Sequence, residues 1–161
     1  MKKLLFLAAT MLLTIAAFAE TIPANDSRVT YVGRTLVEGT DVSFDWTATY
    51  FRLSFSGRSL IMRATDTKWD ATPEMAATRH KYYNVWIDAP MSAEPHRIIE
   101  VASADTIIEL IDPAYLKKSK IKEHQVIVQK RTEGEQGKMT IHEFATDAKG
   151  VFHQAEPILK R

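Results

Sequence analysis

The chain has 161 residues, of which 45% are hydrophobic and 25% are charged. This composition is typical of a single globular domain and excludes collagen-like, disordered and coiled-coil chains. The 21 basic and 20 acidic residues give a formal charge of +1. Without Lys2 and Lys3, which we expect to be removed, the balance is 19 to 20, or about −1, which predicts no binding to nucleic acid or to an anionic membrane. The sequence holds no cysteine, so disulfides, thiolate metal sites and a cysteine nucleophile are excluded.

The N-terminal residues have the pattern of a secretory signal peptide. Lys2 and Lys3 form a basic start, residues 4–17 form an uncharged apolar run, and Ala17 and Ala19 frame a small-x-small cleavage site before Glu20. The run is short for a membrane span, and no second apolar segment follows it. We therefore expect residues 1–19 to be removed near Ala19. The mature chain is then periplasmic or secreted, without a membrane span.

After Glu20, apolar residues recur with a period of two, which indicates β-strands. Because Gly57 and Arg58 interrupt two such runs, we expect residues 51–65 to form a β-hairpin. Trp46 alternates with Phe44 and is expected in the core. About nine strands at this spacing predict an all-β chain, an antiparallel β-sandwich or barrel; the expected strands are 29–36, 42–46, 51–56, 60–65, 82–88, 97–101, 105–111, 123–131 and 139–145.

Segments outside these strands complete the expected organisation. Residues 113–120 are the one helical candidate, and residues 70–80 predict a loop because Pro73 breaks the alternation. Residues 132–137 contain two glycines and predict a hairpin turn. We expect one β-sandwich domain at residues 20–150, followed by a C-terminal linker at residues 151–161, where Pro157 disfavours helix.

The sequence holds no recognisable catalytic or metal-binding motif. A G-x-S-x-G nucleophile elbow is absent, and so is a glycine-rich phosphate loop. The histidines do not form an H-x-H or H-E-x-x-H pair, so a zinc site is not predicted; they are His80, His96, His124, His142 and His153. We therefore predict no catalytic residue, no metal and no cofactor.

Aromatic residues in the segment 82–88 are the best candidates for a binding site. Alternation places Tyr82, Asn84, Trp86 and Asp88 on one face of the expected strand. Flat rings beside amide and carboxylate groups suit a sugar, because rings cover C–H surfaces and polar groups bond to hydroxyls. The same face could instead pack against another sheet or domain. Trp69, in the expected loop, could close one side of a sugar site.

Four segments, residues 33–35, 43–46, 82–88 and 130–137, resemble the N-terminal domain of carbohydrate esterase family 2. The likeness runs in order from about Arg28 to about Phe144, and the Arg-Thr-Glu-Gly-Glu-Gln-Gly segment at 131–137 is its most specific part. It implies a jelly-roll β-sandwich, which in that family precedes an SGNH-type hydrolase domain that deacetylates plant polysaccharides such as xylan. The family's catalytic serine lies in that second domain, and no position here matches it.

The resemblance implies a non-catalytic accessory module of an exported acetylxylan-type esterase. Such a module would support deacetylation by binding plant polysaccharide, such as acetylated xylan, or by packing on an SGNH hydrolase domain. Two alternatives stay open. The chain could be part of a split or truncated acetylesterase whose activity needs the other domain, or a stand-alone carbohydrate-binding protein.

Overall fold

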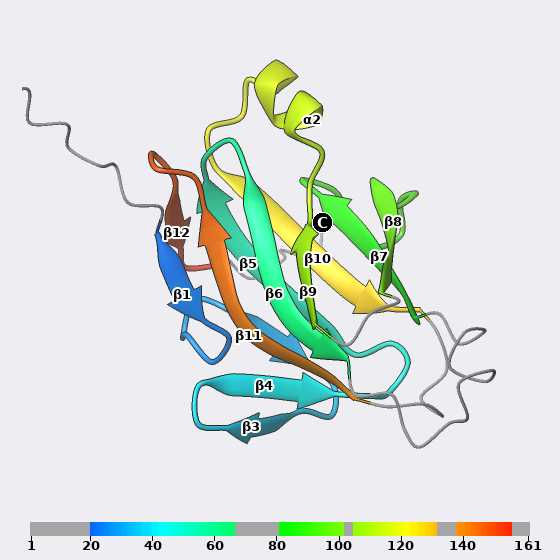
Figure 1. Ribbon diagram of the computed structural model, residues 1–161. Coiled ribbons are helices and arrows are strands. Elements are labelled where there is room, and N and C mark those ends of the chain that lie inside the picture. The colour runs from blue at the N-terminus through cyan, green and yellow to red at the C-terminus, as the bar shows by residue number, and fades with distance from the viewer. Residues whose placement is uncertain (1–19, 67–80, 102–104, 132–137, 156–161) are drawn as a thin grey trace, which may run out of the picture.

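The computed structural model describes residues 20–66, 81–101, 105–131 and 138–155 (Figure 1). Two six-stranded antiparallel sheets pack face to face, which confirms the predicted all-β sandwich. Sheet A consists of β1 (Thr21–Pro23), β3 (Leu36–Glu38), β4 (Asp41–Phe44), β6 (Leu60–Asp66), β9 (Asp105–Glu109) and β11 (Met139–Thr146). Sheet B consists of β2 (Thr30–Val32), β5 (Tyr50–Ser56), β7 (Lys81–Ile87), β8 (Arg97–Val101), β10 (His124–Lys130) and β12 (Val151–His153).

The order of the strands is that of a jelly roll. Four strands of sheet A, in the order β4-β11-β6-β9, face four strands of sheet B, in the order β5-β10-β7-β8. Most successive strands therefore cross from one sheet to the other, as double-sheet jelly rolls require. Sheet A lies in front of sheet B in Figure 1.

The core lies between the two sheets because each strand turns its apolar residues to the same side. Phe51, Leu53 and Phe55 of β5 are fully buried, and so are Leu60 and Met62 of β6. Rings also meet across the sandwich, where the centroids of Phe51 and Phe144 are 5.2 Å apart and those of Phe44 and Tyr83 are 6.4 Å apart. Burial of this apolar surface is the main driving force for folding.

The prediction of a β-hairpin at residues 51–65 is wrong. The two strands form, but β5 belongs to sheet B and β6 to sheet A, so they do not pair with each other. Gly57, with a φ of 144°, lies in the connection between the sheets. Alternation defines the apolar face of each strand but not its partner, and here the two apolar faces meet across the core.

Strands β10 and β11 repeat this arrangement, because they flank residues 132–137 and lie in different sheets. The hairpin expected there is therefore also wrong, although the turn itself lies outside the described residues. The expected loop at residues 70–80 lies outside them too.

The expected strand at residues 29–36 is in fact two strands in different sheets. Strand β2 pairs with β5 and strand β3 with β4, and the chain changes direction at Gly33, whose φ is 115°. A Cβ at Gly33 would lie 2.7 Å from Thr49 Oγ1, so the position needs glycine both for its conformation and for space.

Two further strands were not expected from the sequence. They are β1, which pairs with β11, and β12, which pairs with β5 at residues expected to begin the linker. Phe152 of β12 is buried against the core, so the sandwich continues to at least this residue.

The expected helix is present as α2 (Pro113–Lys118), two residues shorter at its C-terminal end. Asp112 caps its N-terminus by accepting a hydrogen bond from the Ala114 N–H at 2.8 Å, and Pro113 occupies the first turn, where no N–H is needed. Helix α2 lies at one end of the sandwich (Figure 1). No helix in the described part of the chain is long and apolar enough to cross a membrane.

Candidate functional site

The residues predicted as a binding site lie on or beside the outer face of sheet B. Pairing of β7 with β10 and β8 places Tyr82, Asn84 and Trp86 on this face, beside Ile127 and Ile98. Asp88 directly follows the strand, whereas Trp69 lies outside the described residues. The structure thus places three of the five predicted residues on one face and Asp88 at the end of their strand, and the role of the group as a binding site stays a prediction.

Trp86 is buried rather than presented as a platform. Its exposed fraction is 4%, and its indole N–H donates a hydrogen bond to the Ala93 carbonyl at 2.8 Å. The neighbouring Ile127 is 1% exposed. Because a stacked sugar must contact an open ring face, this conformation of Trp86 favours packing over sugar binding.

Two polar atoms on the same face are buried without a partner. Arg52 is opposite Ile127 in the register of β5 and β10, and Asn84 is opposite Gln129 in that of β7 and β10. Within the described chain, neither Arg52 Nε nor Asn84 Oδ1 has a hydrogen-bond partner. Buried polar atoms are nearly always paired in native proteins, so each of these two atoms carries a desolvation cost in this conformation.

Apolar side chains at both edges of this face are half exposed, with β8 at one edge and β2 and β12 at the other. Ile98 of β8, Val32 of β2 and Val151 of β12 have exposed fractions of 46%, 42% and 48%. By register all three lie on the outer side of sheet B. A buried apolar centre with an incompletely covered apolar edge is a feature of protein-packing surfaces.

Asp88 has a local structural role. Its carboxylate lies 2.7 Å from Nδ1 of His124 and accepts a hydrogen bond from the Gln125 N–H at 2.9 Å. The His124 side chain is almost completely buried. Asp88 adopts a φ of 52°, a conformation that asparagine and aspartate tolerate better than most residues. These contacts join the end of β7 to the start of β10.

Trp46 is not in the core, contrary to the sequence prediction. Strand β4 ends at Phe44, and Trp46 lies in the following turn with an exposed fraction of 52%. Ala48, with a φ of 65°, bends the chain there, so alternation no longer decides which side a residue faces. The Arg34 guanidinium lies over the Trp46 ring, 4.6 Å from its centroid. Motifs 33–35 and 43–46 therefore meet in space, which sequence spacing did not reveal.

Asp41, His142 and Thr65 form a hydrogen-bonded chain on sheet A. His142 Nδ1 lies 3.0 Å from Asp41 Oδ2, and His142 Nε2 lies 2.6 Å from Thr65 Oγ1. A hydroxyl bonded to an imidazole, which in turn bonds to a carboxylate, is the order of groups in a Ser-His-Asp triad. The three residues lie on the adjacent paired strands β4, β11 and β6, so this hydrogen-bonded chain runs across the surface of sheet A.

The fold and this site define the class of the protein as a jelly-roll β-sandwich module. The chain belongs to the carbohydrate esterase 2 N-terminal family, whose pattern matches residues 31–155. This match confirms the family inferred from the sequence motifs. A search of curated proteins gives no match.

Solved structures of carbohydrate esterases have a similar fold. The family two esterase of Cellvibrio japonicus has a TM-score of 0.65 at 18% identity, with 89% of this chain and 37% of that chain covered. The acetyl xylan esterase of Butyrivibrio proteoclasticus has a TM-score of 0.63 at 11% identity, with 89% and 35% covered. A family two esterase of Clostridium thermocellum, solved with cellohexaose, has a TM-score of 0.62 at 16% identity, with 83% and 35% covered. The chain thus spans little more than a third of these relatives.

Proposed function

We propose that this chain is an exported, non-catalytic accessory module of an acetylxylan-type carbohydrate esterase. It supports polysaccharide deacetylation by packing the outer face of sheet B on an SGNH hydrolase domain. The observation that carries this proposal is the set of half-exposed apolar side chains on the outer side of sheet B, Ile98, Val32 and Val151, around the buried Trp86 and Ile127. A hydrolase surface that covered them would remove this apolar area from water. Export implies cleavage near Ala19, which mass spectrometry of the secreted chain tests.

Sugar binding is the second candidate, and Trp46 favours it. Its ring is half exposed, and a cation–π contact with Arg34 restricts its motion. A pre-ordered ring loses little entropy when a sugar stacks on it, so weak binding to a neutral polysaccharide is plausible on physical grounds. In that case the chain acts as a carbohydrate-binding protein, alone or beside a hydrolase. A split acetylesterase is a variant of the first proposal, in which the hydrolase domain is a separate chain.

Self-association of the isolated chain tests the packing proposal. Without its partner, the outer face of sheet B should pair with a second copy, and sedimentation should show a mass that rises with concentration. The change Ile98→Ser should reduce this association, whereas Ile107→Ser on the outer side of sheet A should not, although Ile107 is more exposed at 68%. A wild-type chain that stays monomeric, or an equal effect of the two changes, contradicts the proposal.

A pull-down on insoluble xylan and cellulose tests the second candidate. Retention that survives added salt and is lost in a folded Trp46→Ala variant supports stacking on Trp46, because neutral sugars release no counterions. No retention of the wild-type chain excludes these two polysaccharides as ligands and leaves the packing proposal intact.

A further inference from the structure

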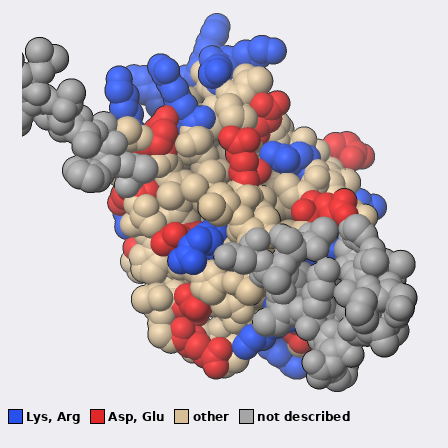
Figure 2. Space-filling model, in the orientation of Figure 1, with Lys and Arg blue, Asp and Glu red and all other residues tan. Residues whose placement is uncertain are grey.

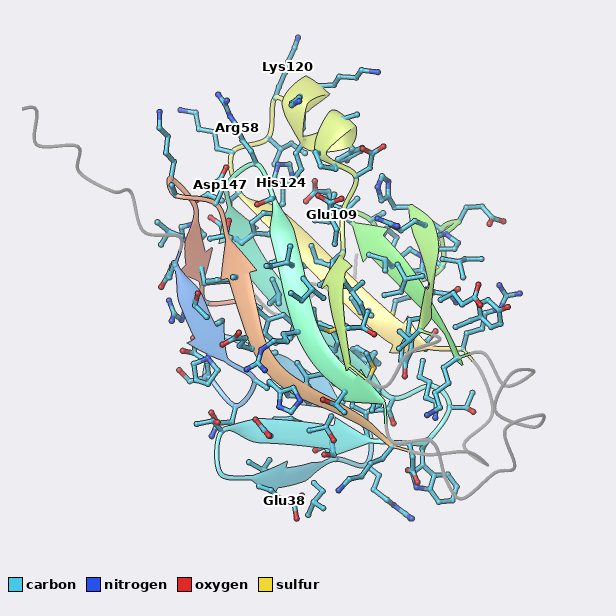
Figure 3. The ribbon with its side chains drawn as sticks, in the orientation of Figure 1. Glu38, Arg58, Glu109, Lys120, His124 and Asp147 are labelled. Atoms are coloured by element: carbon cyan, nitrogen blue, oxygen red, sulfur yellow. The ribbon has the colours of Figure 1, made fainter. Side chains whose placement is uncertain are left out.

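Basic residues that are far apart in the sequence gather at the end of the sandwich that carries α2. Space-filling and stick views show Lys and Arg side chains around this helix, with Arg58, Asp147 and His124 close together and Lys120 extending into solvent (Figures 2 and 3). The segments 57–59, 112–123 and 147–150 contain six basic and three acidic residues, a balance of +3 in a chain of formal charge +1. The basic residues are Arg58, Lys117, Lys118, Lys120, Lys122 and Lys149.

A cleft of about 480 Å³ lies between these segments. This volume is within the usual range of small-ligand sites. Four of the basic residues line the cleft, together with Ser119, Ile121, the buried His124 and Asp147; the four are Arg58, Lys117, Lys122 and Lys149. We call this the basic cleft.

The basic residues of the cleft are not neutralised by the acids around them. Among the described residues, none of the four has a carboxylate within ion-pair distance. The Asp147 carboxylate accepts hydrogen bonds from the backbone N–H groups of Arg58 at 2.9 Å and Lys149 at 3.3 Å. Asp147 therefore positions the two turns that carry these cations, while Asp88 below the cleft bonds to His124 and Gln125.

The helix alone does not account for this cluster. Lys117 and Lys118 lie in the last turn of α2, where the helix dipole favours cations. Arg58, Lys122 and Lys149 lie outside the helix. Like charges held close together repel one another, so an anionic ligand in the cleft would relieve a cost that the free chain bears.

We propose that the basic cleft binds an acidic polysaccharide through the carboxylates of its uronic acid units. Lysines are mobile point charges, which suits carboxylates spaced along a sugar chain better than a fixed planar ligand. The described lining contains no tryptophan, tyrosine or phenylalanine on which a nucleic-acid base could stack. Ile121 is the one half-exposed large apolar residue in the described lining, and a single such side chain offers too little apolar surface for insertion into a membrane.

Binding of the full chain to polygalacturonate, followed by affinity electrophoresis, tests this site. The double change Lys117→Gln/Lys122→Gln should weaken binding about fivefold for each lysine removed. Raising the salt concentration from about 0.05 to 0.2 M should weaken the wild-type complex further. The matched control is Arg131→Gln/Lys138→Gln, which removes the same charge at the opposite end of the sandwich and should leave binding unchanged.

Three results would overturn the proposal. They are no binding of the wild-type chain to polygalacturonate, an equal loss in the control, or tighter binding to phosphatidylglycerol vesicles or single-stranded DNA than to polygalacturonate. Binding to neutral xylan is measured in parallel. If the chain binds xylan, and this binding persists in salt and requires Trp46, the result supports the second candidate function and says nothing about the basic cleft. Circular dichroism of each variant verifies that the fold is retained.

Discussion

The alternation pattern predicts the surroundings of the two described tryptophans unequally well. Trp46 was expected in the core and is half exposed, while Trp86 was expected on a face that either binds a sugar or packs on another element, and it is 4% exposed. The reason is local in each case. Trp46 lies beyond the end of β4, in a turn where strand alternation no longer applies, and Trp86 lies on an outer sheet face that is buried at its centre.

Substitution by alanine should therefore cost much more stability at Trp86 than at Trp46. Trp86→Ala removes a buried ring and its hydrogen bond to Ala93, so it should lower the free energy of unfolding by about 3–5 kcal/mol. Trp46→Ala removes an exposed ring and a cation–π contact and should cost less than about 1 kcal/mol. Urea unfolding followed by circular dichroism measures both values. Greater destabilisation by Trp46→Ala would refute these assignments.

At the scale of elements, one arginine joins the two short strands that the sequence did not predict. The Arg28 guanidinium donates hydrogen bonds to Asp26 at 2.8 Å, to Glu20 at 2.8 Å and to the Phe152 carbonyl at 3.3 Å. Glu20 precedes β1 and accepts a hydrogen bond from the Phe152 N–H in β12 at 2.7 Å. Strands β1 and β12 lie in different sheets, so this cluster holds the sandwich together at its edge.

The cluster predicts a loss of stability in acid. The hydrogen bond from Arg28 holds the pKa of Asp26 below its ordinary value. Burial opposes ionisation of Glu20, but hydrogen bonds from Phe152 and Arg28 outweigh burial and lower the pKa of Glu20. Carboxyl groups with a lowered folded-state pKa stabilise the fold above their unfolded pKa of about 4. That stability is lost as the pH falls through the lower, folded-state pKa.

The variant Arg28→Gln should be less stable than the wild type at pH 7 by about 1 kcal/mol. The difference should shrink as the pH is lowered below about 4, because both carboxyl groups then become neutral in either protein. Lys138→Gln, which removes an exposed contact with Glu38, serves as a control with little effect at any pH. A difference between wild type and Arg28→Gln that stays constant down to the lowest pH would contradict this account of the cluster.

The sequence predicted the strands better than their pairing. Alternation placed β5, β6, β7 and β10 within one or two residues because it follows from which side of a strand is buried. Pairing depends on contacts between distant residues, and two expected hairpins were therefore wrong. The basic cleft was missed for the same reason: Arg58, Lys117 and Lys149 are separated by long stretches of chain, and the net charge of the whole sequence conceals them. Gly33 offered a usable signal for the break between β2 and β3.

At the scale of the whole molecule, the proposal of a non-catalytic module makes a prediction about activity. We predict that the isolated chain releases no acetate from acetylated xylan or from an aryl acetate, because acyl transfer needs an activated nucleophile and an oxyanion hole together. The hydrogen-bonded chain of Asp41, His142 and Thr65 makes this a real test. Turnover above a heat-inactivated control that disappears in Thr65→Ala or His142→Ala would refute the prediction.

The most direct measurement for the packing proposal uses the absence of cysteine from the chain. The change Ile98→Cys introduces a single thiol on the outer face of sheet B, and Ile107→Cys introduces one on sheet A as the matched control. Each thiol is labelled with a photo-crosslinker in the full chain, expressed in its own host. Mass spectrometry of the crosslinked products then identifies what contacts each face. We predict an SGNH hydrolase joined at position 98 and absent at position 107. No hydrolase at position 98, or equal capture at both positions, would contradict the proposal that sheet B is the docking face.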